Sequence, residues 1–176
     1  MGLCLDGRWF VESQTTARTT AYNFGRDTRW CTAQALARLG IIRLAFSPVG
    51  AEITGYSFKR FLAVDTSAAH PEKTLFHELA HIRLGHSEQI ERRSRAGRLD
   101  GPEEIMAEAV AMLLAGALSM PGSIESGALL RPAFARCGLT EPDAARVFKV
   151  ADEILAAGRE NTITWPVHGR RKSPRR

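Results

Sequence analysis

The clearest chemistry in this 176-residue chain lies in one five-residue motif, His77-Glu78-Leu79-Ala80-His81. On a helix, side chains four positions apart lie on one face, so the two histidines would point the same way. Two neutral imidazoles at this spacing can hold one zinc ion, each at about 2 Å. Glu78 would flank the metal and take a proton from a water molecule beside it. The motif predicts a catalytic zinc (Zn²⁺) site with Glu78 as general base; the alternative is an amphipathic helix with polar surface residues.

A catalytic zinc site needs a third protein ligand. The pattern H-E-x-x-H-x-x-G-x-x-H is excluded, because Leu84 and Ser87 stand where it requires glycine and histidine. A later helix offers Glu104 and Glu108, four residues apart. Glu108 lies deep in an apolar pattern, where a buried carboxylate needs a partner such as a metal. We therefore expect Glu108 as third ligand and Glu104 as a residue that orients a ligand histidine. The reverse assignment stays open, as does a solvent face for both.

The group that stabilises the oxyanion is not fixed by the sequence. Tyr56 and His86 have side chains able to donate a hydrogen bond to it. His86 follows Gly85, which should end the motif helix, so we expect an orienting or structural role for His86 rather than metal binding. A structural role is the alternative for Tyr56 as well.

Two helices must position these groups. Pro71 and Glu72 are typical of a first turn and Gly85 of a helix end. The second helix begins at Asp100-Gly101-Pro102, where acidic residues follow in the first turn, and continues to about Ser119. Both helices should pack closely, because small residues follow Glu104 and Glu108 on their face.

The remaining pattern predicts an α+β domain with a small, mostly antiparallel sheet of three to four strands. The charged segment from Ser87 to Gly101 contains Arg92, Arg93, Arg95 and Arg98; we expect a solvated loop, with a groove for an acidic substrate as the alternative. The expected strands lie at Arg8–Glu12, Ile41–Phe46, Ile53–Phe58 and Arg60–Val64, with a turn at 47–50 and an extended segment at Thr162–Val167. The other expected helices are one capped by Asp27-Thr28 that runs to Leu39 and one from Thr140 to Ala157, and Ala128–Ala135 should form a weak helix or a loop.

Composition indicates a soluble globular protein, with 44% hydrophobic and 24% charged residues. No apolar run is long enough to span a membrane, and the N-terminus lacks the features of a signal peptide. The three cysteines are widely spaced, which fits a reducing interior and favours a cytoplasmic location. We expect one domain over residues 1–165, with a poorly defined extension at 1–27 and a basic tail at 166–176.

The net charge of +5 comes from the end of the chain. Residues 170–176 hold five basic and no acidic side chains, which leaves 19 of each in the rest. Such a tail is usually solvated, and binding of nucleic acid or an acidic partner is the alternative.

The segments LFHELAHIRLGH and EEIMAEAVAMLLAGAL resemble the zincin-like metallopeptidases of the ImmA/IrrE type. They are more similar still to the peptidase domain of ArdC-type antirestriction proteins. The likeness runs from about Gln34 to Leu118 and includes Gly55-Tyr56 and the block Ala107-Glu108 with Ala111. It implies a minimal gluzincin, in which His77, His81 and Glu108 bind zinc and Glu78 is the base. Residues 1–33 are too short for the single-stranded-DNA-binding domain of full-length ArdC-type proteins, and no helix-turn-helix unit is evident.

The resemblance implies hydrolysis of a protein or peptide, specifically a regulatory or host-defence protein, by an enzyme of mobile-element or phage-related origin. An extended substrate could pair with strand Ile53–Phe58 or Arg60–Val64. Two alternatives stay open: a non-catalytic zinc-stabilised protein that binds a restriction system or repressor, and a DNA-associated regulator that uses the basic tail.

Overall fold

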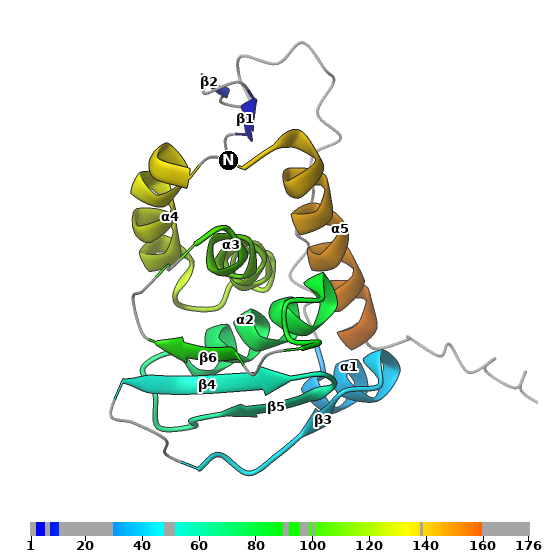
Figure 1. Cartoon of the computed structure of the whole chain (residues 1–176). Helices are drawn as coiled ribbons and strands as arrows, with labels where there is room; N and C mark the ends of the chain where they lie inside the picture. Colours follow the sequence, from blue (N-terminus) through cyan, green and yellow to red (C-terminus); the bar gives the residue numbers. More distant parts are fainter. Residues whose placement is uncertain are drawn as a thin grey trace, which may run out of the picture.

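A four-stranded sheet carries layers of helices on one face (Figure 1). The structure is a computed structural model that describes residues 3–5, 8–10, 30–47, 52–89, 92–95, 99, 101–137 and 139–159. In chain order its elements are β1 (Leu3–Leu5), β2 (Arg8–Phe10), α1 (Thr32–Leu39), β3 (Ile42–Arg43), β4 (Ile53–Phe58), β5 (Phe61–Val64), α2 (Pro71–Leu84), β6 (Arg92–Arg95), α3 (Pro102–Ala117), α4 (Ser123–Cys137) and α5 (Glu141–Gly158). The predicted α+β class is confirmed.

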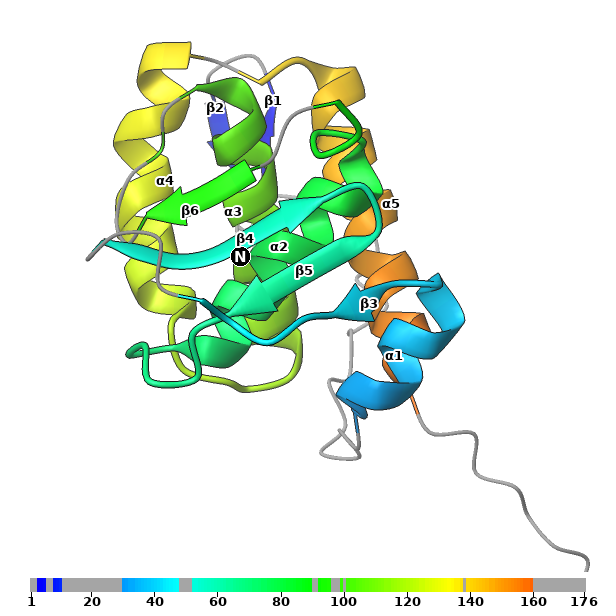
Figure 2. The same ribbon diagram turned by 60° about the horizontal axis from the view of Figure 1, so that its bottom comes forward.

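The main sheet has the strand order β3-β5-β4-β6 (Figure 2). β4 pairs antiparallel with β5 and with β6, and β3 pairs parallel with β5. The expected mostly antiparallel sheet is therefore confirmed. Along β4, Ile53, Gly55 and Ser57 are buried and alternate with half-buried residues. Since strand side chains alternate between faces, the buried set faces the helical layer.

Helices α2 to α5 form two layers above the sheet, and α1 lies beside β3 and α5 (Figure 1). α2 lies against β4 and β5, and α3 packs on α2 with α4 and α5 on its flanks. Because α3 is enclosed on several sides, every residue from Ile105 to Ala111 is buried, as are Leu114 and Ala115. Phe76 and Leu79 of α2 meet Ile105 and Leu114 of α3 in the centre of this core.

The ends of α2 follow the signals in the sequence. Pro71 stands in its first turn, where the missing N–H is not needed for the helical ladder. Gly85 ends the helix in the left-handed conformation, with φ of 82°, which glycine adopts without steric cost. α5 begins with a capping box in which the Thr140 hydroxyl accepts from the Asp143 N–H and Asp143 accepts from the Thr140 N–H. The predicted bounds of these two helices are confirmed to within about a residue.

Several other predicted bounds were wrong. α1 begins at Thr32 with Cys31 at the N-cap, later than the expected Asp27-Thr28 cap. β3 is only Ile42–Arg43, since Ile41 instead closes the end of α1 by donating to the Leu36 carbonyl.

Two segments are more regular than predicted. The expected arginine-rich loop contains β6, which pairs with β4 along its whole length. The weak helix expected at Ala128–Ala135 is the complete helix α4, which packs against α3.

A tryptophan joins the first and last parts of the described body. Trp30 forms a β-bridge with Arg159, and the next N–H, of Cys31, donates to the Gly158 carbonyl at 2.8 Å. The indole N–H of Trp30 donates to the Ile154 carbonyl at 3.2 Å, and the ring packs edge-on against Phe76. α1 and α5 are thereby fastened to each other and to the core.

β1 and β2 form a separate antiparallel pair, which includes most of the strand expected at Arg8–Glu12. The rest of the predicted extension at 1–27, most of the predicted turn at 47–50, the expected extended segment Thr162–Val167 and the basic tail lie outside the described residues. Within the described part, no helix combines the length and apolar character that crossing a bilayer requires.

Candidate metal centre

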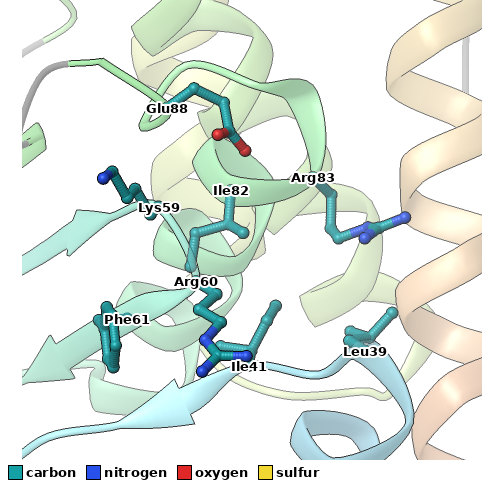
Figure 3. Close-up of a pocket in the computed structure, with 8 residues that line it drawn as sticks. All are labelled: Leu39, Ile41, Lys59, Arg60, Phe61, Ile82, Arg83 and Glu88. Carbon is teal, nitrogen blue, oxygen red and sulfur yellow. The ribbon is translucent and has the colours of Figure 1, made fainter.

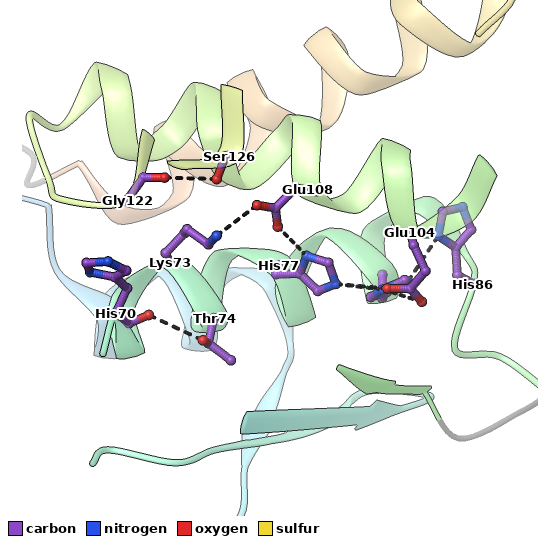
Figure 4. Close-up of polar contacts among 10 residues, drawn as sticks. His70, Lys73, Thr74, His77, His86, Glu104, Glu108, Gly122 and Ser126 are labelled. Carbon is purple, nitrogen blue, oxygen red and sulfur yellow. Dashed lines mark hydrogen bonds and ion pairs between the residues drawn. The ribbon is translucent and has the colours of Figure 1, made fainter. Parts of the chain in front are cut away.

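Three side chains from two helices converge between α2 and α3 (Figure 4). His77 and His81 lie one turn apart on α2, and their Nε2 atoms are 3.1 Å apart. Glu104, in the first turn of α3, places one carboxylate oxygen 3.3 Å from Nε2 of His77 and the other 3.3 Å from Nε2 of His81. Both histidines are buried, whereas 16% of the Glu104 side chain is exposed, so the site reaches the surface beside Glu104.

These separations fit a zinc ion. In tetrahedral coordination with ligands at about 2.0–2.1 Å, neighbouring donor atoms are about 3.3 Å apart. The two Nε2 atoms are 3.1 Å apart, Oε2 of Glu104 lies 3.3 Å from Nε2 of His77, and Oε1 of Glu104 lies 3.3 Å from Nε2 of His81. With one donor atom taken from each residue, all three atoms lie within 4.8 Å of one another. Two imidazoles and one carboxylate are also a donor set that zinc accepts in catalytic sites, with a fourth position open.

Glu108 lies on the other side of the His77 ring from Glu104. One of its oxygens is 3.0 Å from Nδ1 of His77, and the other accepts from Nζ of Lys73 at 2.8 Å. The physical reason is the helical rise, since four residues along α3 move a side chain by about 6 Å. The structure therefore brings Glu104 to the position expected of Glu108, and gives Glu108 the orienting contact expected of Glu104.

His86 provides a comparable contact for the second histidine. After Gly85 the chain turns back, and the His86 N–H donates to the His81 carbonyl at 2.9 Å. The Nδ1 atoms of His81 and His86 are 3.2 Å apart. With the proton on Nδ1 of His81, this contact leaves its Nε2 lone pair facing Glu104 and His77. The expected orienting role of His86 fits this geometry; its possible role as transition-state stabiliser stays a prediction.

Glu78 lies on the sheet side of α2, completely buried above Gly55 of β4. A Cβ atom at position 55 would come within 2.7 Å of Oε1 of Glu78 and 2.8 Å of Cγ2 of Thr74. Only glycine leaves this space for the carboxylate. Glu78 is also near enough to His77 for its charge to raise the pKa of that imidazole.

Tyr56 is not placed to stabilise an oxyanion at this site. It follows Gly55 on β4, so it points to the opposite face of the sheet from α2. Its hydroxyl donates to the Ala45 carbonyl at 3.5 Å, and its ring lies against Phe46. The sheet thus separates Tyr56 from the histidines, and the structural alternative holds.

The carboxylates strongly affect proton binding at the site. Burial on its own would lower the pKa of His77, but the hydrogen bonds to Glu104 and Glu108 raise it to about 10. Burial would raise the pKa of Glu108, yet the His77 hydrogen bond and the Lys73 charge lower it to about 2. For Glu104 the contacts with both histidines outweigh burial and hold the pKa well below its usual range. The imidazole and the two carboxylates therefore shift one another's pKa in the direction that favours their charged forms.

Lys73 is the site residue that the sequence reasoning missed. It lies four residues before His77, so the helical period places both on one face of α2. That spacing, together with a basic residue in a first turn where acids are favoured, was the available signal.

A separate surface pocket of about 360 Å³ lies between the turn of β4 and β5 and the end of α2 (Figure 3). Its walls combine apolar side chains with cationic groups and one acid, and are formed by Leu39, Ile41, Lys59, Arg60, Phe61, Ile82, Arg83 and Glu88. None of these residues belongs to the centre described above, so the pocket and the candidate metal centre are distinct.

Comparison with known proteins gives one match. Residues 39–157 match a peptidase family described as the IrrE N-terminal-like domain. No curated protein and no solved structure matches the chain. The match covers both helices of the centre and most of the described body, which confirms the ImmA/IrrE-type resemblance, while the closer likeness to ArdC-type proteins stays a prediction. The chain belongs to the IrrE N-terminal-like family of peptidases.

Proposed function

We propose that the protein is a zinc-dependent endopeptidase in which His77, His81 and Glu104 bind the metal and Glu78 is the general base. The observation that carries the proposal is the convergence of two Nε2 atoms, 3.1 Å apart, on one carboxylate whose two oxygens each lie 3.3 Å from one of these nitrogens. Glu104 replaces Glu108 as our proposed third ligand, because Glu108 faces Nδ1 of His77 instead.

When bound, zinc supplies a Lewis acid that polarises a peptide carbonyl and lowers the pKa of water to about 7. Glu78 accepts the proton released by the attacking water and passes it to the leaving amine. Glu78 directly follows His77 in α2, lies against Gly55, and is near enough for its charge to act on the His77 imidazole. Glu108 and His86 hold the two imidazole rings in the orientation that binding requires.

The substrate would enter as an extended chain. β4 and β5 each have neighbours on both sides, so the edge expected from the sequence is closed. Among the described strands, β6 is the end strand that also contacts α2, and we propose that the substrate pairs with its outer edge. A site this enclosed favours one exposed segment of a specific protein over general digestion. A regulatory or host-defence protein fits this requirement.

Metal content tests the site. The purified protein should carry about one zinc per chain. Glu104→Ala should lose it, because one of three ligands is removed, whereas Glu108→Ala should keep a weakened site. Loss of zinc in Glu108→Ala but not in Glu104→Ala would make Glu108 the third ligand. Absence of zinc from the native protein after reconstitution would refute the proposal of a metallopeptidase.

Cleavage is tested with a peptide mixture from a digested proteome, analysed by mass spectrometry for new termini. Glu78→Gln is the matched control, since it keeps the shape and the metal ligands but removes the base. Termini produced by the native protein and absent with Glu78→Gln would support an enzyme. Identical peptides with both, at full zinc occupancy, would favour the zinc-stabilised binding protein.

A further inference from the structure

Lys73 occupies a position next to the metal centre that the proposed reaction does not use. Its Nζ donates to Oε1 of Glu108 at 2.8 Å, and Oε2 of Glu108 accepts from Nδ1 of His77 at 3.0 Å. These contacts form a continuous chain from Lys73 through Glu108 to a proposed ligand (Figure 4). Only 17% of the Lys73 side chain and 5% of the Glu108 side chain are exposed, so solvent screens this pair less than a surface ion pair.

The lysine stem is held in place by the turn between α3 and α4. Gly122 in this turn has φ of 99°, and a Cβ there would come within 2.9 Å of Cδ of Lys73 and 3.5 Å of its Cβ. The backbone at Gly122 therefore lies directly over the Lys73 stem. Lys73 has little freedom to turn its ammonium group away from Glu108.

The charges explain why a cation is needed there. Glu78, Glu104 and Glu108 all lie near His77, and two of them contact its ring. A buried carboxylate needs a partner with the opposite charge or a set of hydrogen bonds. Lys73 supplies this partner to Glu108 through the ion pair at 2.8 Å.

We propose that Lys73 is a positioning residue: it holds Glu108 aimed at Nδ1 of His77, so that the ring presents Nε2 to the metal. This inference rests on the proposed function, because it assumes that a metal binds at Nε2. In this arrangement the Lys73 ammonium group contacts Glu108 and acts on His77 through that carboxylate. Changes to such outer partners of metal ligands typically weaken metal binding by about 10- to 100-fold.

The experiment measures the dissociation constant of zinc by competition with a chromogenic chelator, and the visible absorption spectrum of the cobalt-substituted protein. The variants are Lys73→Met, Lys73→Arg, Glu108→Gln and the double variant Lys73→Met/Glu108→Gln. Lys149→Met on the exposed side of α5 is the matched control for loss of a lysine. The double-mutant cycle isolates the coupling between positions 73 and 108.

We expect Lys73→Met to weaken zinc binding by about 10- to 100-fold and to alter the cobalt spectrum. Lys73→Arg should recover part of the affinity, since it retains the charge. In the Glu108→Gln background Lys73→Met should have almost no further effect, because the lysine acts through the missing carboxylate. Lys149→Met should match the native protein.

Two results would overturn the inference while leaving the proposed function intact. One is native zinc affinity and a native cobalt spectrum in Lys73→Met. The other is an equal loss of affinity on removing Lys73 in both the native and the Glu108→Gln backgrounds. Failure of the native protein itself to bind zinc would instead refute the proposed function, and this inference with it.

Discussion

Replacing Gly55 with alanine should disable the general base and leave the metal site in place. The added Cβ would lie 2.7 Å from Oε1 of Glu78, where ordinary contacts begin at 3.4 Å, so the carboxylate must move by about 0.7 Å. The same Cβ would lie 2.8 Å from Cγ2 of Thr74, so the new methyl group cannot move toward Thr74 to relieve the clash. A displacement of about 1 Å in a catalytic group costs roughly 100-fold in rate, and we expect Gly55→Ala to lose tens- to a hundredfold in turnover.

The cost in stability should be smaller than the cost in activity. Overpacking a buried site typically costs about 1–3 kcal/mol, whereas native domains have about 5–15 kcal/mol of stability. Gly55→Ala should therefore fold, and it should bind zinc nearly as well as the native protein because His77, His81 and Glu104 are not displaced.

The assay compares zinc content, the unfolding midpoint in urea and the cleavage rate of a peptide identified from the proteome mixture. Gly127→Ala in α4 is the matched control, because its Cβ meets only Met112 Sδ at an ordinary 3.8 Å. Native turnover by Gly55→Ala would show that the position of the Glu78 carboxylate does not limit catalysis, and would refute this reasoning. Loss of zinc together with activity would point to a collapse of the whole site.

Three further changes test other parts of the structure. Gly158→Ala would drive a methyl group into the Trp30 indole, and urea unfolding should show a loss of about 1–3 kcal/mol; an unchanged midpoint would contradict the close packing. Thr140→Ala removes half of the capping box with Asp143 and should cost about 1 kcal/mol, measured in the same way. For pH, the raised pKa of His77 stabilises the metal-free fold below pH 6.5, and this contribution is lost as pH rises toward about 10. Zinc competes with a proton for His77, and this competition weakens as the pH rises, so the increase in melting temperature on adding zinc should be larger at pH 8 than at pH 6. An equal increase at both pH values would contradict a His77 pKa raised by Glu104 and Glu108.

The helix of the metal motif was predictable because its signals are local. Pro71, Gly85 and the spacing of the two histidines each act within a few residues, and the structure places the helix and its ligand face as expected. The strand bounds of β4 and β5 were nearly right for the same reason, since short runs of strand-favouring residues and the tight turn between them are properties of adjacent residues.

The choice between Glu104 and Glu108 as the third ligand could not be made from the residues close to them in the sequence. Both carboxylates lie on the same face of α3, and the one that meets Nε2 of His77 depends on how far α3 slides along α2. Packing of the two helices fixes that position, and no residue within either helix encodes it alone.

β6 was missed because an arginine-rich segment has weak intrinsic preference for a strand, and its pairing with β4 is a tertiary contact. α4 was underestimated because Gly127 and Pro132 lower helix propensity, which packing against α3 overrides.

The bridge between Trp30 and Arg159 holds the chain just before α1 next to the chain just after α5. A fold whose entry and exit are adjacent can be inserted into a surface loop of another protein without separating the host's strands. It can also be circularly permuted by a short linker from 159 to 30, with new ends opened in the exposed turn at Lys59 and Arg60. The bridge therefore makes the segment from Trp30 to Arg159 suited to insertion into another protein, with α2 and α3 in the interior of the inserted domain.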